Sequence, residues 1–250
     1  MTAPILLALP AHDEADAVAA VIARVPATIA GHPVRCLVVD DGSTDHTGAI
    51  ARRAGAEVLT FPTNRGLGAA VRAALAHGVR IGAAAVAFCD ADGEYAPEEL
   101  GALVAPILAG EADYVVGSRF AHGHPHTMRP HRELGNRVLT AWVRRLTGRR
   151  ITDGQSGYRA LSPAAATAAV IRHDFNYAQV LTLDLLDKGF RYHEVPISYR
   201  FRTTGSSFIR LGPYLRAVVP AVRAHRLEQA QPAQSSTTWE RNPSTAAAHA

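Results

Sequence analysis

With 250 residues, 48% of them hydrophobic, the chain can bury one large core or at most two small ones. Its net charge of +4 comes almost entirely from arginine and favours anionic partners without identifying them. No run reaches the roughly 18 apolar residues of a membrane-spanning helix, and the start lacks the basic segment of a signal peptide, so we expect a soluble or peripheral protein of the cytoplasm.

The first half of the chain alternates between two kinds of pattern. Short apolar runs typical of buried strands occupy residues 5–10, 34–41, 56–62, 83–92 and 112–120. Stretches with helical spacing, each with Asp, Ser, Thr or Pro near its start, occupy residues 14–24, 45–54, 68–80 and 97–109. This alternation predicts an α/β fold with a mostly parallel sheet covered by helices on both faces.

The second half is less regular. An Arg/His-rich segment covers residues 119–150, "TDGQSGYRALS" follows, and then come a predicted helix near 176–188 and a predicted strand in "YHEVPISYRFR". From about residue 227 the composition is polar and rich in Ala, Ser and Pro, which predicts a disordered tail over 227–250. We therefore expect a single domain over residues 1–226.

Acidic residues follow the first, second and fourth predicted strands, at the sheet edge where α/β proteins bind ligands. In "FCDADGEY", Asp90 and Asp92 are two residues apart at a strand end, and both can reach one Mg²⁺ or Mn²⁺ ion bound to a diphosphate. The structural alternative is that Asp90 caps a turn and Asp92 caps the next helix.

Two adjacent carboxylates, Asp40 and Asp41, end the second buried strand in "LVVDDGSTD". Helix capping explains Ser43, Thr44 and Asp45, but it does not explain this pair. The hydroxyls of a ribose or the edge of a base offer donors that suit such acceptors.

A glycine pair, Gly66 and Gly68, opens the third predicted helix and lies some 22 residues before Asp90. This spacing imitates a dinucleotide-binding fingerprint. However, the third glycine position holds Val71, and the first strand runs into "PAHDEA" instead of a glycine-rich turn. We retain only that glycine leaves room here for the backbone to approach a nucleotide.

In this order, the motifs resemble those of family 2 glycosyltransferases with the GT-A fold. The matching segments are "PAHDEA", "VVDDGSTD", "NRGLGAAVRAAL", "DADGEY", "GSRF", "GNR", "TDGQSGYRALS" and "EVPISYRFRTTGSS", over roughly residues 3–215. Three of them, "GSRF", "DGQSGYR" and "EVPISYRFRTTGSS", are most similar to the polyprenyl-phosphate branch, which includes the dolichyl-phosphate mannosyltransferases. The resemblance implies a nucleotide-binding half over 1–118 and an acceptor half over 119–226.

The resemblance also implies site residues for the nucleotide-sugar donor. Asp90 and Asp92 would hold the Mg²⁺ or Mn²⁺ ion and the diphosphate, and Gln179 would face the sugar. The remaining donor-binding residues would be Pro10, Glu14, Asp40, Asp41 and Gly66.

On the acceptor side, Arg119 and Arg132 would meet the acceptor phosphate, and Arg202, with Ser207 beside it, would neutralise phosphate charge. The chain departs from the family at three places. It has Asp13 where members usually carry Asn and Phe208 where they often carry Lys, and it lacks the hydrophobic C-terminal extension of self-anchored members.

The acceptor decides whether the reaction needs a base. A lipid phosphate is already anionic and would attack the anomeric carbon directly, with inversion. A hydroxyl acceptor, such as a glycan or a small metabolite, would need a carboxylate, for which Asp153 is the candidate. The structural alternative for Asp153 is a turn residue paired with Arg159.

Other features have simpler interpretations. The cysteines, Cys36 and Cys89, lie in apolar runs and are expected to be buried free thiols. The segment 120–137 contains four histidines that suit a transition metal, but we predict an exposed acceptor loop. These histidines are His122, His124, His126 and His131.

Peripheral membrane contact is predicted for four arginines and for residues 208–227 as an interfacial helix. The alternatives are that residues 208–227 form a helix that packs on the domain, and that a membrane-anchored partner protein supplies the anchor. The four arginines are Arg144, Arg145, Arg149 and Arg150.

Two further classes are weighed against a transferase. A sugar nucleotidyltransferase would share the sheet and its carboxylates, but the chain has no glycine-rich "GxGTR" loop after the first strand. A non-catalytic nucleotide-sugar binding module stays open, although the presence of both Asp90 and Asp92 argues against it. No sequence feature indicates a nucleic-acid partner.

Overall fold

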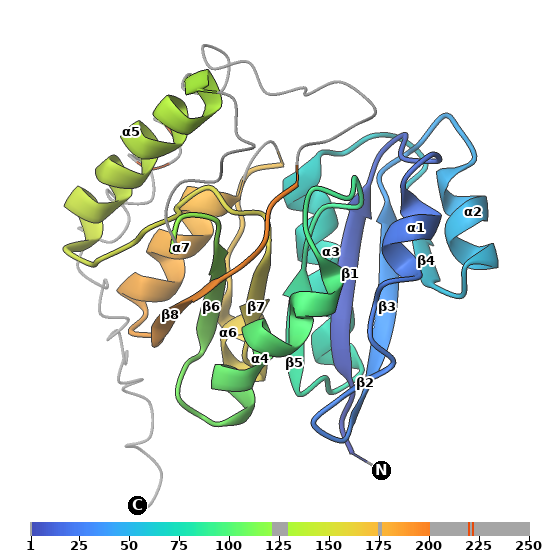
Figure 1. The fold of residues 1–250 in the computed structure, drawn as a ribbon, viewed down its shortest axis with the longest axis horizontal. Coiled ribbons are helices and arrows are strands. Elements are labelled where there is room, and N and C mark those ends of the chain that lie inside the picture. The colour runs from blue at the N-terminus through green and yellow to red at the C-terminus, as the bar shows by residue number, and fades with distance from the viewer. Residues whose placement is uncertain (1, 122–129, 175–176, 201–219, 221, 223–250) are drawn as a thin grey trace, which may run out of the picture.

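An eight-stranded sheet forms the centre of the computed structural model, which describes residues 2–121, 130–174, 177–200, 220 and 222 (Figure 1). β1 is buried along its whole length, because its apolar residues face the core on both sides of the sheet. The strands are β1 (Ile5–Ala11), β2 (Thr28–Ile29), β3 (His32–Asp40), β4 (Glu57–Thr60), β5 (Ala85–Phe88), β6 (Tyr114–Ser118), β7 (Arg159–Leu161) and β8 (Tyr192–Pro196).

The strand order is β2-β3-β1-β5-β7-β6-β8, and β4 pairs with β3. Strands β1, β3, β4 and β5 run parallel, and β6 runs parallel to β8. β7 is antiparallel to both β5 and β6, so β6 points the same way as β5. The carboxyl ends of β1, β3, β5 and β6 therefore meet at one edge, the upper one in Figure 1. The predicted mostly parallel sheet is confirmed.

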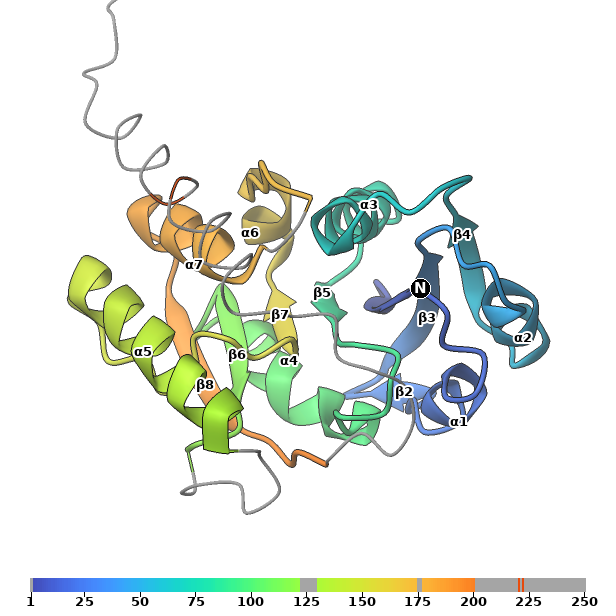
Figure 2. The same cartoon turned by 90° about the horizontal axis from the view of Figure 1, so that it is seen from above.

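Helices cover both faces of this sheet, as predicted (Figure 2). Because neighbouring residues of a strand point to opposite faces, Leu7 and Leu9 pack with α1 and α4, whereas Leu6 and Ala8 pack with α3, α6 and α7. The helices are α1 (Val18–Ile22), α2 (Thr47–Arg53), α3 (Leu67–Arg80), α4 (Leu100–Leu108, after a 3₁₀ turn at Pro97–Glu99), α5 (Pro130–Thr147), α6 (Pro163–Ala168) and α7 (Ala178–Asp187).

Helix α5 lies at the edge of the molecule, outside α7 and β8 in both views (Figures 1 and 2). Its buried residues Leu139 and Val143 are on the side turned toward the fold, and Leu139 clusters with Val180 and Leu183 of α7. Each fully buried aliphatic side chain contributes about 1.5–3 kcal/mol, so this small cluster is enough to dock the helix.

The second half differs most from the prediction. An exposed loop was predicted over 120–137, but α5 begins at Pro130, a residue that the first turn of a helix accepts. Strand β7 and helix α6 were not predicted at all. Helix α1 is also shorter than the predicted 14–24, because residues 14–17 form turns. The predicted tail over 227–250 and histidines 122, 124 and 126 lie outside the described residues, as does the predicted interfacial helix apart from Pro220 and Val222.

Both cysteines are free thiols, as predicted; Cys89 is buried as expected, but Cys36 is only partly buried. In the part of the chain that the structure describes, none of the helices combines the length and the apolar character needed to cross a bilayer.

Candidate active site

The ends of β1 and β3 lie side by side at the carboxyl edge of the sheet. Ala11 is the register partner of Asp40, and the N–H of Asp41 donates to the Ala11 carbonyl at 2.8 Å. Pro10, buried at the end of β1, is the register partner of Val39. The strands therefore bring the predicted donor-binding residues of "PAHDEA" and "VVDDGSTD" together.

The Asp40–Asp41 pair organises the backbone around this edge. Asp41 accepts from the N–H groups of Arg65 and Gly66 at 2.7 and 2.8 Å, and Asp40 accepts from the Ser43 N–H at 3.0 Å. Both aspartates are only 5% exposed. Gly66 has φ +92°, a conformation that suits glycine. The carboxylate of Asp41 thus fixes the turn that starts α3.

The backbone conformation and the hydrogen bond at position 13 suit Asp13 as well as the asparagine expected from the family. The φ of Asp13 is +53°, in the left-handed region that Asp and Asn tolerate best, and its Oδ1 accepts from the Thr44 N–H at 2.7 Å. An asparagine oxygen would accept the same bond. Next to it, the Glu14 N–H donates to Thr47 Oγ1 at 2.8 Å, which ties this loop to α2.

Asp90 and Asp92 follow β5. Burial raises the pKa of Asp90 to about 7, the negative charges of Asp92 and Glu94 add to this rise, and Arg119 opposes it. Asp92 accepts from the Glu94 N–H at 3.0 Å. The alternative prediction that Asp92 caps the next helix is wrong, because the N-cap residue of the following 3₁₀ turn is Ala96. Asp92 stabilises a turn instead.

The carboxylates of Asp90 and Asp92 fit a divalent ion that arrives with its substrate. In the described ranges, no group of three or more His, Cys, Asp or Glu side chains is placed to hold a metal by itself. Mg²⁺ typically takes one or two carboxylates and completes its shell with water and substrate phosphates. Burial is the main cause of the raised pKa of Asp90, and the negative charges of Asp92 and Glu94 that add to it are charges that a divalent cation would offset.

Arg119 and Asp153 form a buried ion pair next to these carboxylates. Arg119 Nε donates to Asp153 Oδ2 at 2.6 Å and Nη2 donates to Oδ1 at 2.9 Å, with side-chain exposures of 9% and 0%. Burial alone would raise the pKa of Asp153, but the charge and hydrogen bonds of Arg119, with a bond from Asn136, hold it below its ordinary value. Asp153 is therefore a weak base in this arrangement.

The alternative pairing of Asp153 with Arg159 is wrong. Arg159 is fully buried, and it donates to the carbonyls of Gly154, Ser156 and Ala178 at 3.1, 2.8 and 2.9 Å. It thereby ties the "DGQSG" loop to the first turn of α7, where Gln179 is 1% exposed. The sequence suggests that Arg159 lies in a turn with Asp153, because a strand of only three residues is too short to show an alternating hydrophobic pattern.

Two tyrosines that the sequence reasoning missed join the carboxylates to this loop. Tyr95 accepts from the Gly157 N–H at 2.7 Å, and Tyr199 donates to Glu94 Oε2 at 2.9 Å. The Arg119 guanidinium lies 5.2 Å from the centre of the Tyr199 ring. Arg202 and Ser207 lie outside the described residues, as does the side chain of Arg132.

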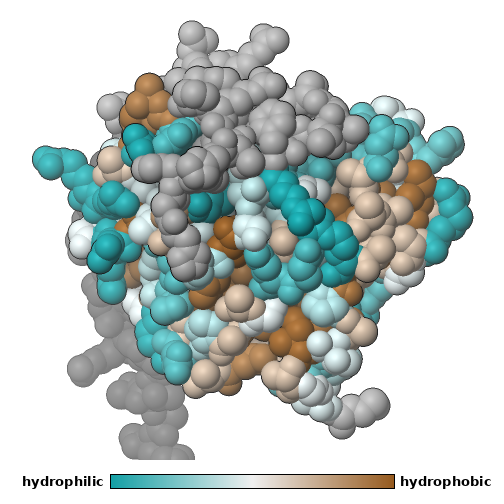
Figure 3. Space-filling view, in the orientation of Figure 1, coloured by the Kyte–Doolittle hydropathy of each residue, from teal (hydrophilic) through white to brown (hydrophobic). Residues whose placement is uncertain are grey.

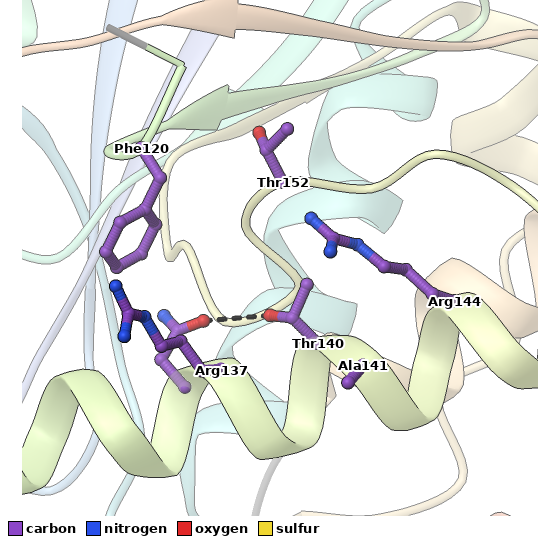
Figure 4. Close-up of a pocket in the computed structure, with 7 residues that line it drawn as sticks. Phe120, Arg137, Thr140, Ala141, Arg144 and Thr152 are labelled. Atoms are coloured by element: carbon purple, nitrogen blue, oxygen red, sulfur yellow. Dashed lines mark hydrogen bonds between the residues drawn. The ribbon is translucent and has the colours of Figure 1, made fainter. Parts of the chain in front are cut away.

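A pocket of about 450 Å³ lies against α5 (Figure 4). Asn136 joins the pocket to the Arg119–Asp153 pair, because it donates to Asp153 at 3.0 Å and accepts from Thr140 at 2.8 Å. The pocket is lined by Phe120, Asn136, Arg137, Thr140, Ala141, Arg144 and Thr152. Sequence reasoning missed it because it depends on α5.

The sheet order and the acidic residues at its carboxyl edge are those of a GT-A glycosyltransferase. The chain belongs to glycosyl transferase family 2, whose sequence profile matches residues 7–177, and it is a hexosyltransferase. It is 34% identical to the polyprenol monophosphomannose synthase of Mycolicibacterium smegmatis, over 81% of this chain and 79% of that protein. It is 30% identical to the undecaprenyl-phosphate mannosyltransferase of Micrococcus luteus, over 88% and 93%.

Solved structures confirm the fold. The structure of glucosyl-3-phosphoglycerate synthase from Mycobacterium tuberculosis with Mn²⁺ and UDP-glucose matches with a TM-score of 0.72 at 25% identity, over 89% of this chain and 79% of that one. The same protein with Mn²⁺, UDP and glucosyl-3-phosphoglycerate matches with a TM-score of 0.69 at 26% identity, over 91% and 80%.

Proposed function

We propose that the protein transfers a hexose, with inversion, from a nucleoside-diphosphate sugar of the GDP-mannose or UDP-glucose type to a polyprenyl phosphate at the cytoplasmic side of a membrane. The two relatives named above are a polyprenol monophosphomannose synthase and an undecaprenyl-phosphate mannosyltransferase. The observation that carries the choice of acceptor is the Arg119–Asp153 pair, because it leaves the site without a ready base at Asp153. A phosphate acceptor is already anionic and needs none.

The donor would bind along the carboxyl edge of the sheet. Asp41 holds the Gly66 turn that would lie against the nucleoside, with Pro10, Glu14 and Asp40 beside it. Asp90 and Asp92 would hold Mg²⁺ or Mn²⁺, which supplies Lewis-acid stabilisation of the charge that develops on the leaving diphosphate. Gln179 would face the sugar.

The acceptor phosphate would approach from the opposite side, toward Arg119. The bidentate bond to Asp153 fixes the direction of the guanidinium, so that Asp153 acts as a positioning residue. The pocket along α5 leads to this pair through Phe120, Asn136 and Thr152. Arg132, Arg202 and Ser207 would add contacts to the phosphates.

A second candidate is transfer to a soluble phosphorylated acceptor with a free hydroxyl. It is favoured by the structural match to a protein solved with glucosyl-3-phosphoglycerate. A hydroxyl would need a proton acceptor, and the low pKa of Asp153 argues against that residue in the role.

A donor panel by calorimetry tests the proposal first. GDP- and UDP-hexoses are titrated with Mn²⁺, Mg²⁺ or EDTA, and tight binding of one donor only in the presence of metal is expected. Transfer from that donor to a short-chain polyprenyl phosphate is then compared with transfer to 3-phosphoglycerate and to glycans. No donor binding by folded protein would overturn the proposal, and donor binding without transfer to any acceptor would support a binding module instead.

A further inference from the structure

Three tyrosine rings lie together next to the carboxylates that follow β5. Hydrophobic and hydrophilic residues are interspersed on the face of the molecule in Figure 3, whereas Tyr95 is only 3% exposed and Tyr158 is fully buried. The Tyr95 ring meets Tyr158 and Tyr199 edge to face, with 6.0 Å between the ring centres in both pairs. Because this packing is favourable in one geometry, the hydroxyl of Tyr95 has a fixed direction.

The hydroxyl of Tyr95 binds the backbone of a second loop. Its oxygen accepts from the Gly157 N–H at 2.7 Å. Gly157 belongs to the loop before β7, which also carries Asp153. The bond therefore joins this loop to the segment after β5 that carries Asp92.

Gly157 lies directly against the carboxylate of Asp90. A Cβ added at Gly157 would be 2.8 Å from Asp90 Oδ2 and 3.3 Å from the Tyr95 hydroxyl oxygen. The first distance is shorter than real Cβ contacts allow, so only a residue without a side chain can approach the carboxylate this closely. The Gly157 peptide thus forms a wall beside Asp90 Oδ2, and the Tyr95 hydroxyl holds that wall.

Other hydrogen bonds hold the rest of the loop. The Gly154 N–H donates to Thr140 Oγ1 at 3.0 Å. The Ser156 carbonyl accepts from Arg159 Nε at 2.8 Å. Loss of the tyrosine hydroxyl would leave both bonds in place, so its effect should fall on the peptide that faces the carboxylate.

We propose that Tyr95 is a positioning residue for the metal-binding carboxylate of Asp90, and that it acts through the Gly157 peptide. This inference rests on the proposed function, in which Asp90 and Asp92 hold Mg²⁺ or Mn²⁺ with the diphosphate. A carboxylate that is already held in place loses less conformational freedom when it binds an ion. Removal of a group that orients a metal ligand typically costs about 10–100-fold in metal affinity or activity.

The neighbouring Tyr158 provides a matched control for a purely structural role. Its ring packs against Tyr95, and its hydroxyl donates to the Pro97 carbonyl at 3.2 Å. Tyr95→Phe and Tyr158→Phe each remove one hydrogen-bonded hydroxyl from the same group of rings, so we expect similar losses of stability. Only Tyr95→Phe removes the bond to the peptide beside Asp90.

The test is a calorimetric titration of Mn²⁺ into the full chain in the presence of GDP or UDP, whichever the donor panel selects. Tyr95→Phe should raise the Mn²⁺ dissociation constant about tenfold, and Tyr158→Phe should stay within about twofold of wild type. Gly157→Ala should also raise it, because the added Cβ would press on Asp90 Oδ2. Circular dichroism and urea denaturation check that each variant is folded.

Transfer measurements separate positioning from a general loss of structure. Excess Mn²⁺ should bring the kcat of Tyr95→Phe to within about twofold of wild type, because a weakened site fills at a higher metal concentration. A kcat that excess Mn²⁺ does not restore would overturn the inference. Wild-type Mn²⁺ affinity in both Tyr95→Phe and Gly157→Ala, or an equal rise of the dissociation constant in Tyr158→Phe, would overturn it as well.

Two outcomes with the wild type distinguish this inference from the proposed function. If wild type binds no Mn²⁺ with either nucleotide, both fail. If wild type binds Mn²⁺, Tyr95→Phe binds it about tenfold more weakly and Tyr158→Phe binds it normally, the role of Tyr95 stands even when no acceptor is glycosylated, and only the proposed function fails.

Discussion

Arg119 and Asp153 are joined by two parallel hydrogen bonds, 2.6 Å from Nε to Oδ2 and 2.9 Å from Nη2 to Oδ1, in a position almost closed to solvent. The pair connects the end of β6 to the loop before β7. Glu194 of β8 holds that loop by accepting from the N–H groups of Thr152 and Asp153. These bonds hold the Arg119 guanidinium in one orientation. Removal of either Arg119 or Asp153 would leave the charge of the other buried without its ion-pair partner.

The first prediction is strong coupling between these two residues. Arg119→Gln and Asp153→Asn should each lower the free energy of unfolding by about 3–5 kcal/mol, because a buried charge loses its partner. The double variant should lose less than the sum of the two. Urea denaturation of all four proteins measures the coupling, and additive losses would show that the pair is not energetically linked.

The second prediction concerns Asp92. Asp92→Ala should lower kcat about 10²–10³-fold, the typical cost of losing one well-placed stabiliser of transition-state charge. It should also weaken Mn²⁺-dependent donor binding in calorimetry. Glu111→Gln removes an exposed carboxylate away from the site and should leave both quantities unchanged. Full activity of Asp92→Ala would remove this residue from the mechanism.

The third prediction is a pH dependence of stability in EDTA. The pKa of Asp90 is raised from its ordinary value to about 7 in the metal-free fold, so the folded chain binds more protons than the unfolded chain between about pH 4 and pH 7. Stability should therefore fall as the pH rises through this range. Asp90→Asn should flatten the profile measured by urea denaturation at each pH. An unchanged profile would assign the dependence to other groups.

Much of the first half follows from the sequence, because each element has a simple signal. Apolar runs end in acidic residues, so the sheet edge and its carboxylates are predictable from spacing alone. The helix starts are less predictable, because α1, α2 and α3 begin after Ala17, His46 and Gly66 and have no side-chain cap. The second half has weaker signals. β7 has three residues, and its Arg159 is buried through hydrogen bonds that no local pattern announces.

The functions of single carboxylates are harder to predict than their positions. Asp41 appears from the sequence as a group free for a ligand, but it accepts two backbone N–H groups from the Gly66 turn. Asp153 pairs with Arg119, 34 residues away, and not with the nearby Arg159. Such choices depend on which loops meet at the sheet edge, and that is a property of the whole fold.

The fourth prediction uses two glycines as a matched pair. A Cβ at Gly68, in the first turn of α3, would lie 1.9 Å from the His173 carbonyl oxygen, whereas a Cβ at Gly101 of α4 would meet nothing closer than 4.0 Å. Gly68→Ala should lower the free energy of unfolding by about 1–3 kcal/mol through overpacking. Gly101→Ala should raise it by about 0.5–1 kcal/mol, because alanine favours the helix.

The clash at Gly68 should also reach the donor site. The Gly68 N–H donates to the Asp174 carbonyl at 2.7 Å, and the adjacent Gly66 turn is the one that Asp41 holds. Displacement of this turn should weaken nucleotide-sugar binding in calorimetry for Gly68→Ala but not for Gly101→Ala. Equal donor affinity of the two variants would separate the turn from the nucleotide and leave Asp41 with a purely structural function.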